Sequence, residues 1–460
     1  MSGKRQKIQY SLALEPQGRG ETPVSGHPRA EPFAAKPAPE SPAVTEQLME
    51  EVCDGENLQS AWKRVRMNQG SPGVDGMTID AAKGYLREHW PSIRSQLLDG
   101  TYQPQPVKRV EIPKPGGGVR KLGVPCVVDR LIQQAVLQVL QERWDPTFSE
   151  HSYGFRPGRS AHQAVAQAQR YVAEGYNVVV DLDLEKFFDR VNHDILMSRV
   201  AVRISDKRVL KLIRASLNAG AMEDGLVLPV DEGTPQGGPL SPLLSNLMLD
   251  DLDKELARRG HRFCRYADDC NIYVRSHRAG ERVMASVSRF LTTKLRLKVN
   301  ETKSAVARPE ERKFLGFSIS NDGGERRVAP KALDTFKMRI REQTCRTRGL
   351  SLSQIIEELT PYLIGWRGYF GFCQTPRVLT NLEARTRQRL RSYLWRQWGN
   401  GHNRFKELRR RGVSQVRAAV AAGSPTGIWR MSGHPAVQSA LRNHYFDSLG
   451  LPRLYVPTPA

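Results

Sequence analysis

The chain has 460 residues, of which 70 are Lys or Arg and 48 are Asp or Glu, and its formal net charge is +22. This length predicts two to four domains, and this charge favours a polyanionic partner. The six cysteines have neither CxxC nor zinc-finger spacing, and no apolar run could span a membrane, so the sequence argues against a disulfide scaffold, a zinc finger and a membrane protein.

The first third of the chain combines an unstructured leader with helices and a strand pair. Residues 1–45 are rich in Pro, Ala and Glu without apolar periodicity, which predicts a disordered leader. Apolar spacing predicts helices over residues 56–68 and 129–144. Between them, "VKRVEIPKPGGGVRKLGVP" predicts two strands joined by a glycine turn, with Lys114 and Arg120 on either side of it.

A basic loop precedes the next predicted helix. Ser160 and Gln163 have the spacing of a capping box, so we expect the helix to begin there. Arg156 and Arg159 lie on the loop just before it, beside backbone N–H groups of the kind that bind phosphate. These two arginines are therefore candidate RNA contacts, and a plain basic loop is the alternative.

Three carboxylates lie at the ends of predicted strands. "NVVVDLDL" predicts a strand from Asn177 to Leu184, with Asp181 and Asp183 on one face. "FCRYADDCNIYV" predicts a hairpin with Asp268 and Asp269 at its tip, although adjacent charges make a poor turn. Divalent cations would remove that repulsion, which favours a two-metal site for phosphoryl transfer. Each signal alone is modest, because a DxD motif also suits glycosyltransferases and phosphatases.

The region from about residue 331 onward is helical and strongly basic. Between Lys337 and Arg411 there are 17 Lys and Arg against 5 Asp and Glu, which favours nucleic acid over a merely solvated surface. Arg385 and Arg389 lie in the arginine-rich "LEARTRQRLRSYLWRQW" and are candidate RNA contacts. The aromatic residues interleaved with this charge are expected to be mostly core.

Several motifs together resemble one family. "DLEKFFD", "PQGGPLSP" and "YADD" resemble the motif blocks of reverse transcriptases and follow the same order. With "GSPGVDG", "GFRPGRSAH" and "YLIGWRGYF", the chain resembles a bacterial group II intron-encoded reverse transcriptase and maturase. No His/Cys cluster follows Cys373, so we expect the endonuclease-lacking type, for which a host DNA 3′ end would serve as primer.

The resemblance implies an α+β fold. It is a right-hand polymerase, with fingers and a palm built on an antiparallel sheet, followed by an α-helical thumb that is also the maturase domain. The expected domains are the leader (residues 1–45), an N-terminal extension and fingers (46–175), the palm with the catalytic carboxylates (176–330), the thumb and maturase domain (331–415) and a C-terminal, DNA-binding segment (416–460).

The resemblance also implies roles for single residues. Asp183, Asp268 and Asp269 would be the catalytic carboxylates and would bind two Mg²⁺ ions together with the backbone carbonyl of Leu184. Asp181 lies outside the family motif and is expected to be structural. The implied nucleotide contacts are Phe188, which would block a ribose 2′ hydroxyl, Gln236, which would touch the incoming nucleotide, and Lys114 and Arg120, which would grip the triphosphate.

The implied function is copying of intron RNA into DNA, with maturase activity that binds the intron RNA to promote splicing and mobility. Its partners would be the intron RNA template, a DNA primer or target and dNTPs, in the bacterial cytoplasm and at the nucleoid when bound to DNA. No membrane partner is expected, and the oligomeric state stays open. The alternatives are an RNA-binding splicing factor without polymerase activity, a retron- or defence-type reverse transcriptase, and an RNA-dependent RNA polymerase, which Phe188 argues against.

Overall fold

The computed structural model describes residues 47–113, 118–223, 226–228, 232–233, 237–321 and 324–456. The leader predicted over residues 1–45 and the candidate nucleotide contacts Lys114 and Gln236 lie outside these residues. Across the described part of the chain, no helix is both long enough and apolar enough to cross a membrane.

Helices form the first described segment. The helices α1 (Leu48–Val52), α2 (Gly55–Met67) and α3 (Ile79–Leu98) all contact α4 (Val127–Trp144). Asp54 and Thr78 cap α2 and α3, and each side chain accepts a hydrogen bond from a backbone N–H of the first turn. The helices predicted over residues 56–68 and 129–144 are confirmed as α2 and α4.

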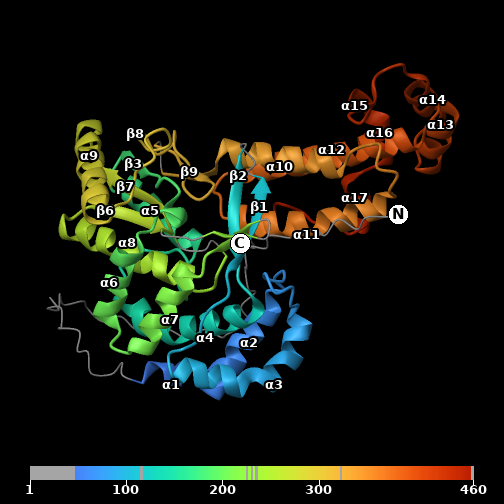
Figure 1. Ribbon diagram of the computed structural model, residues 1–460. Helices are drawn as coiled ribbons and strands as arrows, with labels where there is room; N and C mark the ends of the chain where they lie inside the picture. Colours follow the sequence, from blue (N-terminus) through green and yellow to red (C-terminus); the bar gives the residue numbers. More distant parts are fainter. Residues whose placement is uncertain are drawn as a thin grey trace, which may run out of the picture. The chain divides into compact units, whose positions relative to one another are not determined.

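A four-stranded sheet contains the predicted strand pair. Strands β1 (Val107–Pro113) and β2 (Val119–Val124) pair antiparallel, as predicted from their sequence. On its other edge β1 pairs in parallel with β4 (Ala221–Glu223), which pairs with β5 (Leu226–Leu228), so the strand order is β2-β1-β4-β5. The β1–β2 ribbon is drawn in cyan in Figure 1.

A second, fully antiparallel sheet positions the carboxylates. Its strand order is β6-β7-β3-β8, formed by β6 (Arg262–Tyr266), β7 (Asp269–Val274), β3 (Val178–Leu182) and β8 (Ala305–Ala307). Side chains alternate between its two faces, as the two-residue period of a strand requires. Val180 belongs to the main core, whereas Val179 belongs to a separate cluster on the opposite face.

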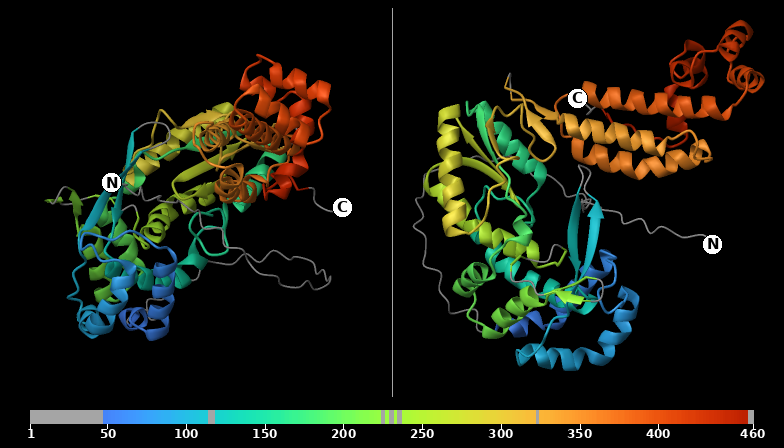
Figure 2. Two further views of the ribbon diagram at one scale, coloured as in Figure 1. Left: turned by 90° about the vertical axis from the view of Figure 1, so that its right-hand side faces the viewer. Right: turned by 45° about the horizontal axis from the view of Figure 1, so that its top comes forward.

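Helices cover both faces of this sheet. The Val180 face packs against α8 (Ser241–Arg258) and α9 (His277–Lys294), and α9 lies along the sheet in Figure 2. The Val179 face packs against α5 (Ala161–Ala173), which begins with the predicted capping box between Ser160 and Gln163. The helices α6 (His193–Arg203) and α7 (Lys207–Asn218) complete the main core.

A separate core begins near residue 328. After β9 (Phe317–Ile319) and β10 (Arg326–Val328), the chain is helical, and one buried cluster extends from Val328 to Leu454. It includes Trp395 and Trp398, so the expectation that these aromatics are core is confirmed. The predicted segments 331–415 and 416–460 share this core, while the predicted domain boundaries themselves remain predictions. Its helices are α10 (Pro330–Gln343), α11 (Leu352–Phe370), α12 (Pro376–Gln397), α13 (Gly401–Arg410), α14 (Gln415–Gly423), α15 (Ile428–Met431), α16 (Pro435–Ala440) and α17 (Asn443–Ser448).

Candidate active site

The tip of the β6–β7 hairpin carries two of the carboxylates. Tyr266 pairs with Asp269, so the two-residue turn consists of Ala267 and Asp268. Ala267 has a φ of +57°, a conformation that normally favours glycine. The Asp-Asp pair therefore does not form the turn by itself, because Asp268 completes it and Asp269 opens β7.

The third carboxylate lies at the end of the neighbouring strand. Leu182, the last residue of β3, pairs with Cys270, which places Asp183 beside Asp269. The backbone of Asp183 is held on both sides. Its N–H donates to the Ser304 hydroxyl (3.0 Å), and its carbonyl accepts from the backbone N–H of Asn300 (2.8 Å).

The three carboxylates share one open cavity. The cavity has a volume of about 1160 Å³, which is large enough for a nucleotide, and it is lined by Asp183, Asp268 and Asp269. Leu184, whose carbonyl is the fourth expected metal ligand, lines the same cavity and forms a β-bridge with Val299. The tertiary structure thus brings together the four residues that the sequence assigned to one metal site.

Burial and like charge raise the pKa values of the hairpin carboxyls. The pKa of Asp268 is raised, chiefly by burial. Burial and the charges of Asp181, Asp268 and Asp183 raise the pKa of Asp269 to about 8. A bound cation would reverse this effect, since carboxylates bind metal in the ionised form.

The donor set fits Mg²⁺ in an open site. Among the described residues, no group of three or more His, Cys, Asp or Glu side chains is placed to hold a metal ion by itself, as a protein cage would. Mg²⁺ rarely uses such a cage, because it keeps several waters and binds through one or two carboxylates plus substrate phosphates. Carboxylates that line an open cavity suit this mode of binding.

Asp181 lies on the same face of β3 but has a different environment. It is buried, and its carboxylate forms an ion pair with Arg312 at 2.6 Å. It is absent from the residues that line the cavity. This position agrees with the expectation of a structural role.

The two adjacent phenylalanines differ in their surroundings. Both rings line the cavity, but Phe187 is buried in the main core whereas Phe188 is half-buried. Lys186, with a φ of +49°, precedes the 3-10 turn Phe187–Asp189, which carries both rings. Arg120 on β2 is exposed and lines the same cavity.

Sequence reasoning missed other residues of the cavity. Lys303 forms an ion pair with Asp183 at 3.6 Å, and Lys298 and Leu315 also line the cavity. The available signal was the basic stretch "LRLKVNETKS", which contains both lysines. Leu315 is linked to the helical segment that follows residue 328, because the Tyr369 hydroxyl on α11 donates to its carbonyl at 2.7 Å.

Comparison with known proteins identifies the family. Residues 112–319 match the family described as "Reverse transcriptase (RNA-dependent DNA polymerase)", and residues 333–412 match "Group II intron, maturase-specific domain". Protein YkfC of Escherichia coli (strain K12) is 33% identical over 300 residues, which cover 56% of this chain and 79% of YkfC. The chain belongs to the group II intron-encoded reverse transcriptases. The predicted family and fold class are confirmed.

A second relative carries the family name explicitly. Group II intron-encoded protein LtrA of Lactococcus lactis subsp. cremoris is 38% identical over 195 residues, covering 42% of this chain and 32% of LtrA. The matched region therefore spans about a third of LtrA. Family membership indicates a reverse transcriptase domain followed by a maturase domain, an RNA template and dependence on a divalent metal.

Solved structures show only distant likeness. A chain of the partial Cas6-RT-Cas1–Cas2 complex has a TM-score of 0.36 and 23% identity, covering 57% of this chain and 46% of that chain. Apo telomerase from Candida tropicalis, truncated from its C-terminal domain, has a TM-score of 0.41 and 15% identity, covering 53% and 60%. The family assignment therefore rests on the sequence matches.

The four arginines predicted to bind RNA have different surroundings in this reverse transcriptase. Arg159 and Arg385 are exposed. Arg156 is buried, and its guanidinium donates to the Asp145 carboxylate and to the carbonyls of Ser149 and Ser152.

Arg389 is half-buried and donates to the carbonyls of Arg341 and Thr344, at the end of α10. For Arg156 and Arg389 the bonds inside the protein argue against the predicted RNA contact and favour a structural role.

A glycine of the "GFRPGRSAH" block lies directly against the Ala267–Asp268 turn. A Cβ on Gly154 would approach the backbone N of Ala267 to 2.3 Å and the backbone C of Tyr266 to 2.9 Å. Gly154→Ala is therefore expected to destabilise the reverse transcriptase by about 1–3 kcal/mol and to lower its activity. Urea unfolding and primer extension would measure the two effects.

Gly84→Ala is the matched control for that substitution. Gly84 lies inside α3, and nothing lies within 4 Å of a Cβ built there. Alanine should stabilise this helix by up to about 1 kcal/mol without changing activity. If Gly154→Ala behaved like Gly84→Ala, the close packing of Gly154 on the turn would be wrong.

Proposed function

We propose that this chain is an RNA-directed DNA polymerase that copies intron RNA into DNA by two-metal nucleotidyl transfer. As a maturase, it would also bind the intron RNA to promote splicing and mobility. Its further partners would be a DNA primer or target, dNTPs and two Mg²⁺ ions, and binding to target DNA would bring it to the nucleoid. The observation that carries the proposal is the convergence of Asp183, Asp268 and Asp269 on one open cavity.

Asp183, Asp268, Asp269 and the carbonyl of Leu184 would hold the metal ions. When bound, two such ions supply activation of the attacking hydroxyl and neutralise charge on the transferred and leaving phosphates. The protein's own contribution is to fix these ligands at the ends of paired strands, where their backbone is held by neighbouring strands and loops.

Other residues of the cavity would select and orient the nucleotide. Phe188 would occupy the space of a ribose 2′ hydroxyl, and Arg120 would hold the triphosphate by bidentate contacts. Lys114 and Gln236, outside the described residues, are proposed for the triphosphate and the incoming nucleotide on the family resemblance alone.

The competing proposal is an RNA-binding splicing factor without polymerase activity. Burial and the charges of Asp181, Asp268 and Asp183 raise the pKa of Asp269, so grouping these carboxylates costs free energy from which RNA binding gains nothing. A retron- or defence-type reverse transcriptase would share the palm, but the match to the maturase-specific domain favours a group II intron protein.

The test is primer extension by purified protein on an RNA template with dNTPs and Mg²⁺. DNA product is expected from the wild type and not from a variant that combines Asp268→Ala with Asp269→Ala. A lane with NTPs in place of dNTPs should also give none. Absence of product from wild-type protein that still binds RNA tightly would reject the polymerase and support the splicing factor.

Binding of RNA is expected to depend on exposed arginines of α12. Arg385→Ala should weaken binding of different RNA sequences to a similar extent and lower the slope of log K against log salt by about 1, as expected for one lost phosphate contact. Arg389→Ala is the comparison, since its guanidinium donates to Arg341 and Thr344, so it should lower the thermal stability instead. Filter binding between 50 and 500 mM salt, roughly the range where counterion release dominates, and thermal unfolding would distinguish the two. An unchanged salt slope for Arg385→Ala would contradict the contact.

A further inference from the structure

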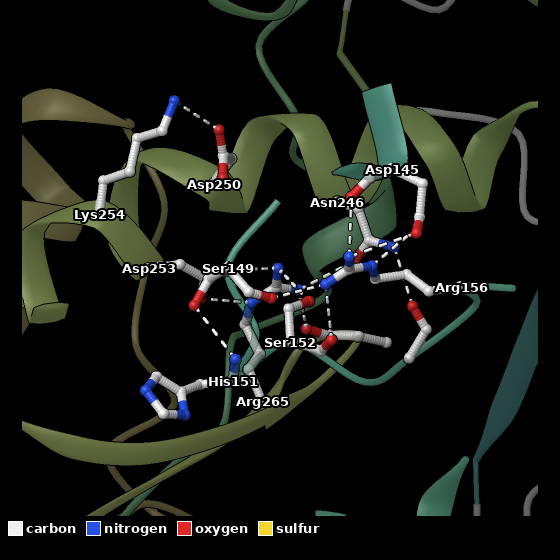
Figure 3. A network of polar contacts seen from close by, with 12 residues as sticks. Asp145, Ser149, His151, Ser152, Arg156, Asn246, Asp250, Asp253, Lys254 and Arg265 are labelled. Carbon is white, nitrogen blue, oxygen red and sulfur yellow. Dashed lines mark hydrogen bonds and ion pairs between the residues drawn. The ribbon is translucent and has the colours of Figure 1, made fainter. Parts of the chain in front are cut away.

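The β6–β7 hairpin carries a completely buried arginine. Arg265, on β6, is 0% exposed. Figure 3 shows its guanidinium among polar groups from α8 and from the loop that follows α4. A charged side chain so far from water is expensive unless every donor has an acceptor.

All five N–H groups of Arg265 have acceptors. The fork of Nε and Nη2 faces the Asp253 carboxylate at 2.7 and 2.6 Å, and Nη2 also donates to the Ser152 hydroxyl at 2.8 Å. Nη1 donates to the Asn246 side-chain oxygen at 3.0 Å. The last donor, again on Nη1, reaches the backbone carbonyl of Ala267 at 2.9 Å. Only a planar guanidinium can satisfy this arrangement.

The bond to Ala267 acts on the turn that carries the carboxylates. Ala267 has the positive φ described above, so local preference alone does not hold it there. The surrounding backbone confines the same turn. The Arg265 N–H donates to the His151 carbonyl at 2.9 Å, and the Tyr153 N–H donates to the Arg265 carbonyl at 2.8 Å.

Asn246 connects the arginine to the opposite wall of the turn. Its Nδ2 donates to the Gly154 carbonyl at 2.8 Å while its Oδ1 accepts from Arg265. Gly154 is the residue whose missing side chain lets its backbone lie against Ala267. The turn is therefore held between the guanidinium and the Gly154 backbone, and Asn246 sets the distance between them.

We propose that Arg265 is a positioning residue that fixes the Ala267–Asp268 turn and thereby the metal-binding geometry of Asp268 and Asp269. This inference rests on the polymerase function proposed above. Arg265 does not line the cavity. It acts through the Ala267 carbonyl, because metal ligands must be held within about 0.5 Å of their productive geometry.

A merely structural arginine would stabilise the palm without affecting metal binding. The chain offers a matched example in Arg203, whose guanidinium also pairs with an α8 carboxylate, that of Asp250, at 2.7 Å and is largely buried. Arg203 lies on α6 and also donates to the Thr147 hydroxyl. Arg265→Lys and Arg203→Lys each keep the positive charge and disturb an ion pair with an α8 carboxylate, through two N–H groups for Arg265 and one for Arg203. Only Arg265→Lys also removes a bond to the turn.

The test measures binding of Mn²⁺, used as the probe metal, to the full-length protein by calorimetry, together with the Mg²⁺ dependence of primer extension. Arg265→Lys is expected to weaken Mn²⁺ binding and raise the Mg²⁺ concentration for half-maximal activity by about tenfold or more, which corresponds to loss of one charge-assisted contact. Arg203→Lys should leave both values as in the wild type, although its thermal stability falls.

A second variant covers the case in which Arg265→Lys does not fold. Asn246→Ala keeps the Arg265–Asp253 pair but removes the link to Gly154, and it should shift the same two quantities in the same direction, by about threefold. The positioning role would be overturned if Arg265→Lys bound Mn²⁺ as tightly as the wild type and Arg203→Lys do. If Arg265→Lys does not fold, the same comparison is made with Asn246→Ala. Wild-type protein that binds Mn²⁺ but makes no DNA would reject the polymerase proposal instead, so the two failures are distinguishable.

Discussion

Replacing Asp183 by asparagine is expected to abolish DNA synthesis while the protein stays folded. The side chain lines the cavity, and the backbone is held by Ser304 and Asn300 independently of the carboxylate. Loss of one anionic metal ligand should remove several kcal/mol of transition-state stabilisation, which corresponds to a fall in kcat of about 10³-fold or more. Single-nucleotide incorporation with saturating template, primer and Mg²⁺ would measure it, and circular dichroism would report the fold.

Asp181→Asn is the control because Asp181 precedes Asp183 by two residues and lies on the same strand face. Its carboxylate pairs with Arg312, so its removal leaves a charge without its partner and should lower the free energy of unfolding. Activity should stay within about tenfold of the wild type, equal to 1.4 kcal/mol or less. Equal losses for the two substitutions would show that charge on this face, and not ligation by Asp183, supports activity.

Replacing Phe188 by alanine is expected to relax discrimination against ribonucleotides. The ring is half-buried and lines the cavity, so its removal would open space beside the sugar of a bound nucleotide. Steric selection of this kind is worth about 1–3 kcal/mol, so kcat/KM for NTPs relative to dNTPs should rise about 10- to 100-fold. Single-nucleotide incorporation with each nucleotide class in separate reactions would give the ratio.

Phe187→Leu is the matched control for the sugar contact. Phe187 also lines the cavity, but it is buried in the main core. Leucine at this position should cost about 1.5 kcal/mol or less of stability with no change in the NTP to dNTP ratio. A shift of the ratio for both variants would mean that general loosening of the segment, and not the Phe188 ring, controls the choice of sugar. An unchanged ratio for Phe188→Ala would reject that residue as the selector.

The strands and helices around the site follow from local sequence. The run of β-branched residues before Asp183 gives β3 over Val178–Leu182, and alternation along it separates the two sheet faces. The Ser160–Gln163 capping box starts α5 as expected, because its two hydrogen bonds are formed within four residues. Such features depend on neighbours along the chain, which the sequence displays directly.

The roles of individual arginines depended on tertiary structure. Arg156 and Arg389 have the charge expected of RNA contacts, but Asp145 and the end of α10 take up their N–H groups. In sequence they cannot be distinguished from the exposed Arg159 and Arg385. Charge is visible in a sequence, whereas desolvation and the choice of partner are set only when distant segments pack together.

By itself, the sequence determined the family. It also determined that the candidate metal-binding carboxylates lie at the end of β3 and at the tip of the β6–β7 hairpin. Only the tertiary structure decided how the Ala267–Asp268 turn between β6 and β7 is held. Local preference would place glycine at position 267, yet Ala267 takes the positive φ. The Gly154 backbone packs against it, and the Arg265 guanidinium donates to its carbonyl. The acceptors of Arg265 include Ser152, 113 residues away, and Asp253, 12 residues away. Buried hydrogen bonds between such distant residues outweigh a local backbone preference of about 1 kcal/mol, because leaving a buried charge unpaired costs more.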